Sequence, residues 1–146
     1  MKILVSACLL GEACRYDGKS KPCEAVLQLA DAHTLIPICP EVLGGLPTPR
    51  IPSERQSDGS VRNAVGEDVT EAYRNGAMEA LRIAQAEGIT LAILKERSPS
   101  CGCGEIYDGS FSKSLTDGNG VTAELLQKHG IRVIGESDET LRGKLQ

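Results

Sequence analysis

The chain has 146 residues, the length of one ordinary domain, so we expect a single α/β domain over residues 1–146 with one hydrophobic core. A formal net charge of −4 argues against general electrostatic binding to nucleic acid or to an anionic membrane, and a small neutral partner is easier to accommodate. With no Trp, three Tyr and one Phe, the core must consist mainly of Leu, Ile, Val and Ala, which suits helices packed on a buried sheet.

Short apolar runs rich in Ile, Leu and Val alternate with segments of helical periodicity. The apolar runs predict buried parallel strands over residues 2–6, 35–38, 90–94 and 131–134. The periodic segments predict helices over about residues 22–32, 69–87 and 119–130. This alternation predicts a doubly wound, mostly parallel and Rossmann-like sheet that is flanked by helices.

The second of these helices has the clearest ends. Asp68 is its predicted N-cap, with Glu71 three residues later, and Gly88 is its predicted stop. Its inward stripe is predicted to contain Val69, Tyr73, Ala77, Ala80 and Ala84.

Two long segments, residues 44–66 and 102–118, do not fit the alternation of strand and helix. Turn-forming residues in both, such as Asp58-Gly59 and Asp108-Gly109, predict one or two extra hairpin loops. Loops of this length are uncommon unless they are functional, so we interpret each segment as a candidate lid or substrate wall. Flexible surface loops are the alternative interpretation.

The cysteine content indicates a metal site or a catalytic thiol. No apolar run approaches the ~20 residues that cross a bilayer, and residues 1–11 are too short to form a secretory signal. We therefore expect a cytoplasmic protein without a membrane partner, and in that compartment six cysteines favour metal binding or catalysis over disulfides.

Three cysteines follow predicted strands: Cys8, Cys39 and Cys101. Because the carboxyl ends of parallel strands lie along one edge of a sheet, these thiols are expected to converge there. Three thiolates form a soft ligand set that suits an iron–sulfur cluster or zinc, and they leave one coordination position free. The alternative is that the cysteines are small buried hydrophobic residues.

A closed zinc site is a weaker interpretation because the chain has no C-x-x-C unit. Cys101-Gly102-Cys103 is a C-x-C unit, and a site with four ligands would need Cys103, Cys14 or Cys23 as its fourth member.

Glu41, two residues after Cys39, is the first candidate for an acid or base, since a partly desolvated carboxyl group has a raised pKa. The alternative for Glu41 is a structural ion pair with Arg50 or Arg55. Ser98 and Ser100 could donate hydrogen bonds to a substrate, or they could simply form a Ser-Pro-Ser turn.

Four separate motifs resemble those of a bacterial family long described as a domain of unknown function and now associated with thiouracil desulfurases. The motifs are VSACLLGEACRYDG (5–18), CPEVLGGLPTPRIPSE (39–54), KERSPSCG (95–102) and GNGVTAELL (118–126), so the resemblance covers nearly the whole chain.

The resemblance implies a [4Fe-4S] cluster held by Cys8, Cys39 and Cys101, with the fourth iron free to bind the sulfur of a thiolated base. It also implies that Glu41 is the catalytic glutamate and that the SPSC motif contains the catalytic serine, for which we favour Ser98. The implied reaction replaces sulfur by oxygen without electron transfer, the open iron acting as Lewis acid and sulfide acceptor.

Other hypotheses remain open at this point. In one, the chain is a non-catalytic sensor or carrier that binds zinc or a cluster through four protein ligands. In the other, Cys101 is the nucleophile of a metal-free thiol enzyme, near the positive charges of Arg97 and Lys95.

Overall fold

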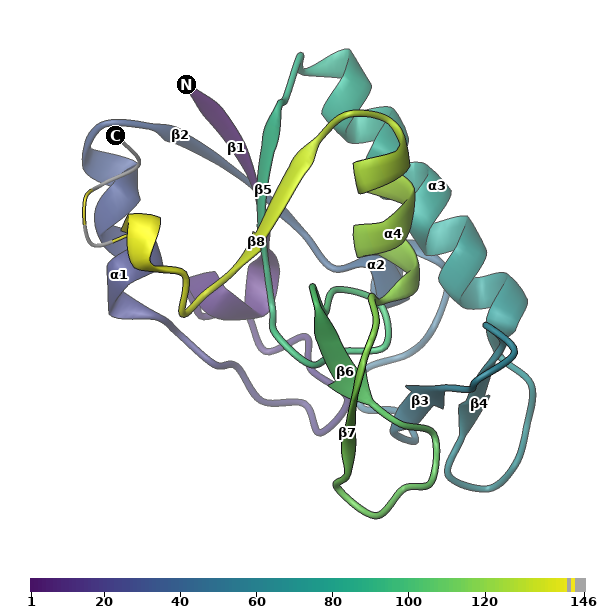
Figure 1. Cartoon of the computed structure of the whole chain (residues 1–146). Coiled ribbons are helices and arrows are strands. Elements are labelled where there is room, and N and C mark those ends of the chain that lie inside the picture. The colour runs from purple at the N-terminus through teal and green to yellow at the C-terminus, as the bar shows by residue number, and fades with distance from the viewer. Residues whose placement is uncertain (142, 144–146) are drawn as a thin grey trace.

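A four-stranded parallel sheet forms the centre of the molecule. The computed structural model describes residues 1–141 and 143, and Figure 1 shows the arrangement of its elements. The strand order is β2-β1-β5-β8, and each neighbouring pair is parallel. The strands are β1 (Lys2–Ser6), β2 (Thr34–Ile38), β5 (Leu91–Leu94) and β8 (Arg132–Gly135), so the predicted strands are confirmed to within one residue at each end.

Helices cover both faces of this sheet, as the prediction of a doubly wound fold requires (Figure 1). On one face, α3 (Thr70–Ala86) and α4 (Val121–Lys128) pack their small and aliphatic side chains against Leu4, Ala92 and Leu94. On the other face, α1 (Glu24–Leu27) and the 3-10 helix η2 (Gln28–Asp31) pack against inward residues of β1 and β5. Alternate residues of β1 therefore pack into two apolar layers, and Ile3, Leu4 and Val5 are all fully buried.

Two helical predictions need correction. The helix predicted over residues 22–32 is instead one turn of α-helix, α1, followed by η2, because so short a segment ends in the tighter 3-10 geometry that is common at helix termini. Helix α3 begins at Thr70, with Val69 rather than Asp68 in the N-cap position. The Asp68 carboxylate still accepts the Thr70 N–H at 2.9 Å, so it satisfies a backbone donor from one position earlier.

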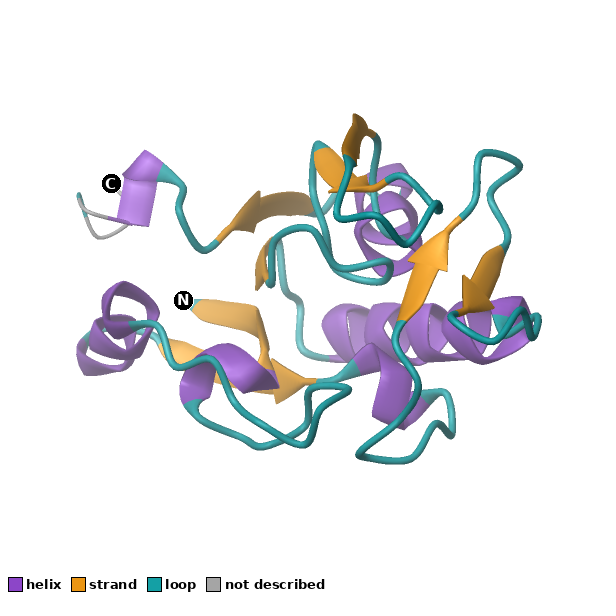
Figure 2. Ribbon diagram, turned by 90° about the horizontal axis from the view of Figure 1, so that it is seen from below, coloured by secondary structure: helices purple, strands orange, loops and turns teal. Residues whose placement is uncertain are grey.

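Both long segments contain antiparallel hairpins, as predicted. Strands β3 (Ser53–Arg55) and β4 (Val61–Asn63) form one, and β6 (Glu105–Tyr107) and β7 (Leu115–Asp117) form the other. Both hairpins lie beyond the carboxyl ends of the central strands, at the lower side of Figure 1. Figure 2 looks onto this side, where loops and short helices gather.

Sequence periodicity does not predict two short elements next to the sheet, because each has only four residues. They are the 3-10 helix η1 (Ala7–Leu10) after β1 and the single-turn helix α2 (Pro40–Leu43) after β2. Helix α2 packs on α3 backbone to backbone. A Cβ on Gly44 would lie 2.0 Å from the Ala72 carbonyl oxygen, and one on Gly76 would lie 1.9 Å from the Pro40 carbonyl oxygen. These glycines therefore fix where α2 lies and, with it, the residues at its start.

A last short 3-10 helix, η3 (Glu139–Leu141), follows β8. No helix in the described part of the chain is both long and apolar enough to span a membrane.

Candidate active site and metal centre

A cavity of about 670 Å³ opens at the carboxyl edge of the sheet. Its walls come from the segments that follow β1, β2 and β5 and from both hairpins. The volume lies within the range of roughly 300–1,000 Å³ that small-molecule sites occupy. The position is the one at which parallel sheets of this kind bind ligands.

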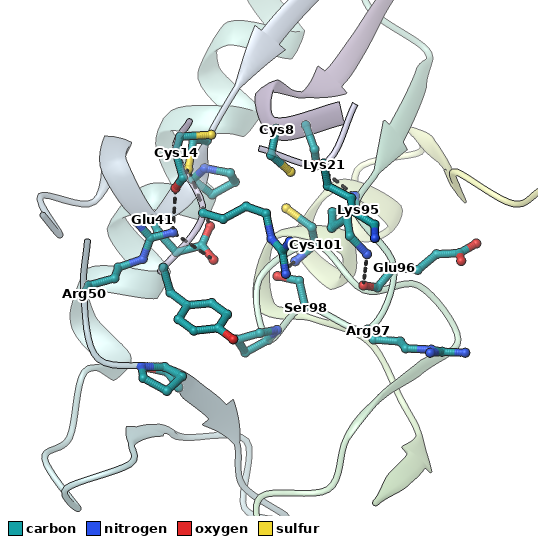
Figure 3. A pocket seen from close by; sticks show the side chains of 18 of the residues that line it. Cys8, Cys14, Lys21, Glu41, Arg50, Lys95, Glu96, Arg97, Ser98 and Cys101 are labelled. Carbon is teal, nitrogen blue, oxygen red and sulfur yellow. Dashed lines mark hydrogen bonds and ion pairs between the residues drawn. The ribbon is translucent and has the colours of Figure 1, made fainter. Parts of the chain in front are cut away.

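The structure brings Cys8, Cys39 and Cys101 together in the lining of this cavity. Cys8 lies in η1, Cys39 occupies the N-cap position of α2, and Cys101 is in the loop after β5. Cys8 and Cys101 are buried, and in Figure 3 their thiol groups point toward one another. Residues that lie far apart in the sequence thus meet at one edge of the sheet.

The three remaining cysteines have different surroundings. Cys14 also lines the cavity, and its carbonyl oxygen lies 3.7 Å from the Cys39 thiol. Contact with Cys39 lowers the pKa of the Cys14 thiol, but contact with Cys8 and burial outweigh it and raise the pKa to about 11. Cys23 packs against the apolar layer next to α1. The Cys103 thiol donates to the Val133 carbonyl at 3.4 Å, outside the cavity lining.

Two of the three predicted ligands, Cys39 and Cys101, lie in surroundings that raise the pKa of their thiols and so favour the protonated form when no metal is bound. Contact with the Cys14 thiol raises the pKa of Cys39, and burial and the charge of Glu41 raise it further. Burial raises the pKa of Cys101, again with a contribution from Glu41. Since a thiolate is the form that binds metal, loading the site must release protons. Within the described residues, no group of three or more His, Cys, Asp or Glu side chains lies close enough together to hold a single metal ion.

The Glu41 carboxylate lies next to one of these thiols. Its Oε1 lies 4.0 Å from the Cys39 Sγ, and the side chain is only 12% exposed. Burial raises the pKa of the Glu41 carboxyl, while the guanidinium of Arg50, 3.9 Å away, acts in the opposite direction. Figure 3 shows both side chains at the cavity wall. Glu41 therefore has the desolvated position expected of a proton-transfer group and also the ion pair with Arg50 that was its structural alternative.

The two candidate serines have different surroundings in the structure. Ser98 lines the cavity, and its hydroxyl oxygen accepts hydrogen bonds from the N–H groups of Ser100 and Cys101, each at 3.1 Å. Because both contacts use lone pairs, the Ser98 hydroxyl hydrogen is left to donate. Ser100 is fully buried, and its hydroxyl bonds the Thr122 hydroxyl at 2.7 Å. Of these two serines, therefore, only Ser98 presents its hydroxyl to the cavity.

The cavity lining is rich in positive charge although the whole chain is acidic. The cations are Arg15, Lys21, Arg50, Lys95, Arg97 and Lys113, against the carboxylates of Glu41, Glu54 and Glu96. Positive charge around the cavity favours an anionic ligand such as sulfide. Arg50, Lys95 and Arg97 could be named from the sequence beside candidate residues, but the gathering of all six cations depends on the approach of separate loops in the folded chain.

Tyr73 also lines the cavity, although its place in the sequence predicts only a core residue of α3. Burial and the nearby Glu41 charge raise the pKa of its hydroxyl. The signal that could have revealed it is the scarcity of aromatic residues in the chain.

A parallel sheet with three thiols, a buried carboxylate and a serine at its carboxyl edge defines a class of thiol-lined α/β ligand-binding proteins. The profile of the 2-thiouracil desulfurase family matches residues 3–138, so the chain belongs to this family. This confirms the resemblance that the sequence motifs indicate.

Two individual proteins are similar over nearly their whole length. The chain is 44% identical over 145 residues to the uncharacterized protein YbbK of Bacillus subtilis (strain 168), covering 93% of this chain and 96% of the relative. A solved structure, the [4Fe-4S]-dependent thiouracil desulfidase TudS (DUF523Vcz), superposes with a TM-score of 0.89 at 46% sequence identity, covering 97% of this chain and 93% of that one. The α/β fold is therefore shared with a structure of known fold and cofactor dependence.

Proposed function

We propose that this chain is a desulfidase that removes sulfur from a thiolated nucleobase such as thiouracil and puts oxygen in its place. The observation that carries the proposal is the convergence of Cys8, Cys39 and Cys101 in one cavity, from three separate strand ends. Membership of the 2-thiouracil desulfurase family supports the substrate class, and the similarity to TudS supports a [4Fe-4S] cofactor.

The donor set fits such a cluster. Three cysteines in a cavity of about 670 Å³ offer soft sulfur ligands together with space for a small ring. Cys8, Cys39 and Cys101 would hold the cluster. When bound, a cluster with one iron free of protein ligands supplies a soft Lewis acid for a thiocarbonyl sulfur and an acceptor for sulfide.

The chain's own residues would move the protons and orient the base. Glu41 takes the proton of the water that attacks the ring carbon, a role suited to a carboxyl whose pKa burial raises. Arg50 holds Glu41 in place through the ion pair and through its own bond to the Cys14 carbonyl at 3.0 Å. Ser98 donates its hydroxyl hydrogen to the base. Sulfur leaves as sulfide and oxygen enters from water, so no electron donor is required.

One feature of the site supports a second candidate function. Cys14 lies beside Cys8 and Cys39, so a closed site with four thiol ligands would be within reach of the chain. In that case the protein would be a non-catalytic sensor or carrier of zinc or a cluster. The metal-free thiol enzyme has less support, because burial raises the pKa of Cys101, whereas an activated nucleophile needs a lowered one.

The deciding experiment is anaerobic purification with iron, acid-labile sulfide and zinc counted per chain, followed by an assay of sulfide release from 2-thiouracil. About four irons and four sulfides per chain, together with sulfide release in the absence of a reductant, are expected. Stoichiometric zinc without sulfide after attempted cluster reconstitution would overturn the proposal in favour of the binding protein.

A further inference from the structure

The aromatic residues of this chain gather at one place. The sequence contains three Tyr, one Phe and no Trp, and all four aromatic side chains line the cavity. They come from separate segments: Tyr16 from the loop after η1, Tyr73 from α3, Tyr107 from β6 and Phe111 from the tip of the β6–β7 hairpin. The apolar layers on the sheet faces are aliphatic, and of the four aromatic residues only Tyr73 belongs to a buried cluster, with Val61, Ala77 and Val121, so packing of the core does not explain the positions of the other three.

Phe111 is the member of this group with the least structural reason for its position. Its side chain is 38% exposed, whereas Tyr73 is buried and Tyr16 lies under the guanidinium of Arg15, 5.9 Å from the ring centroid. The backbone of Phe111 has φ 56°, in the left-handed region that residues other than glycine rarely adopt. A bulky apolar residue held in this conformation at a cavity wall points to a functional constraint.

The opposite hairpin holds Phe111 in place. The Glu54 Oε1 on β3 accepts the N–H of Gly109 at 2.9 Å and the N–H of Phe111 at 3.1 Å. Gln56 adds a hydrogen bond from its Nε2 to the Gly109 carbonyl at 3.3 Å. One carboxylate oxygen thus fixes the tip of the β6–β7 hairpin against the cavity.

We infer that Phe111 is a substrate-binding residue whose ring packs against the planar face of the base, and that Glu54 is the positioning residue that holds it there. This inference rests on the proposed function for the identity of the ligand. Stacking of a base on an aromatic ring changes affinity by roughly 5- to 150-fold, and the partial exposure of Phe111 places the expected effect near the lower end.

Steady-state kinetics of the cluster-loaded enzyme with 2-thiouracil give the first test. Phe111→Ala is expected to raise KM about tenfold, with kcat within about twofold and the iron content unchanged, whereas Phe111→Tyr restores KM. Leu115→Ala is the matched control, because Leu115 is on the same hairpin and 37% exposed but does not line the cavity. An unchanged KM in Phe111→Ala, or an equal rise in Leu115→Ala, overturns the inference.

The role of Glu54 has its own signature. Glu54→Gln keeps a side-chain oxygen that can accept both N–H groups, so it should retain KM to within about twofold. Glu54→Ala should raise KM severalfold. Because Glu54 acts through Phe111, the double variant Glu54→Ala/Phe111→Ala should be no worse than Phe111→Ala alone. Additive effects in the double variant would exclude this linkage.

A binding measurement separates failure of this inference from failure of the proposed function. Since the chain has no Trp, Phe111→Trp introduces a single indole reporter, and Leu115→Trp introduces a control on the same hairpin. Addition of 2-thiouracil to the cluster-loaded proteins should quench the emission at position 111 and leave position 115 unchanged. Quenching without sulfide release by the wild type supports the ring site while the desulfidase proposal fails. Sulfide release by the wild type without quenching at position 111 overturns the ring site alone.

Discussion

Substitution of Glu41 distinguishes a role in proton transfer from a role in holding the metal. Its Oε1 is 4.0 Å from the Cys39 thiol, but the carboxylate is held by Arg50. Glu41→Gln keeps the shape and removes the ionisable group, so it should retain iron and sulfide while losing about 10²- to 10⁴-fold in kcat. Cys101→Ala should instead lose the cluster.

The measurement for these variants is kcat with 2-thiouracil beside iron and sulfide per chain. Glu12→Gln is the control, since Glu12 is exposed and outside the cavity lining. A fully active Glu41→Gln enzyme would remove Glu41 from the mechanism.

Substitutions of the two serines of the SPSC motif should have different effects, one on activity and the other on stability. Ser98→Ala is expected to lower kcat by at least about tenfold, and Ser98→Thr, which keeps the hydroxyl, should recover much of it. Ser100→Ala leaves the buried Thr122 hydroxyl without its partner and should cost about 1–3 kcal/mol of stability. Measuring kcat and Tm for each variant distinguishes the two roles. A large loss of kcat in Ser100→Ala at unchanged Tm would reverse the assignment.

At the scale of elements, the contact between α2 and α3 controls where Glu41 lies. Helix propensity alone predicts that Gly76→Ala stabilises α3 by about 1 kcal/mol. The structure predicts the opposite, because the new methyl group would lie 1.9 Å from the Pro40 carbonyl oxygen, next to Glu41. A net loss of about 1–3 kcal/mol and reduced activity are expected. Thermal unfolding checks this against Asn75→Ala, an exposed position on the same helix, which should be neutral or slightly stabilising.

A second contact joins the β3–β4 hairpin to α4. Arg55 forms an ion pair with Glu124 at 2.6 Å and donates to the Asn119 carbonyl at 2.8 Å. Hydrogen bonding to Arg55 lowers the pKa of Glu124, so the stabilisation is complete above the ordinary glutamate pKa of about 4.3 and is lost as the pH falls through the lowered value. Glu124→Gln should therefore lower the stability at pH 7 by less than about 1 kcal/mol, as expected for a partly exposed pair, with a correspondingly lower Tm, and make no difference near pH 2. A Tm difference that persists at pH 2 would show that charge is not its cause.

The elements differ in how far the sequence determines them. The four central strands follow from local apolar runs, and α3 and α4 from periodicity over several turns. Helix α2 has four residues, too few for any periodicity, and its position depends on Gly44 and Gly76, which lie far apart along the chain. The same holds for the site. The convergence of Cys8, Cys39 and Cys101 follows from strand order. The hydrogen bond between the Phe111 N–H and Glu54 instead depends on the approach of two hairpins, which no local sequence pattern predicts.

On the scale of the whole molecule, most of the core is separate from the site, although the two share a few residues. Strand residues such as Ile3, Leu4 and Ile93 are fully buried between aliphatic layers on both faces of the sheet. Of the three predicted ligands, Cys8 and Cys101 also belong to these layers and line the cavity, whereas Cys39 lines the cavity alone. The fold should therefore not depend on the cluster, although the cluster should stabilise it.

This separation predicts the effect of removing the cluster. A group that binds only the folded chain raises the free energy of unfolding by mass action. The increase is about 3–4 kcal/mol when the free group is present at about 100 to 1,000 times its Kd. For a chain of this size that corresponds to a Tm about 5–15 °C higher in the loaded protein. Far-UV circular dichroism should be the same with and without the cluster, because strands and helices pack on each other. Loss of the helical signal on chelation would instead mean that the thiol edge folds only around its metal, as in small metal-dependent domains.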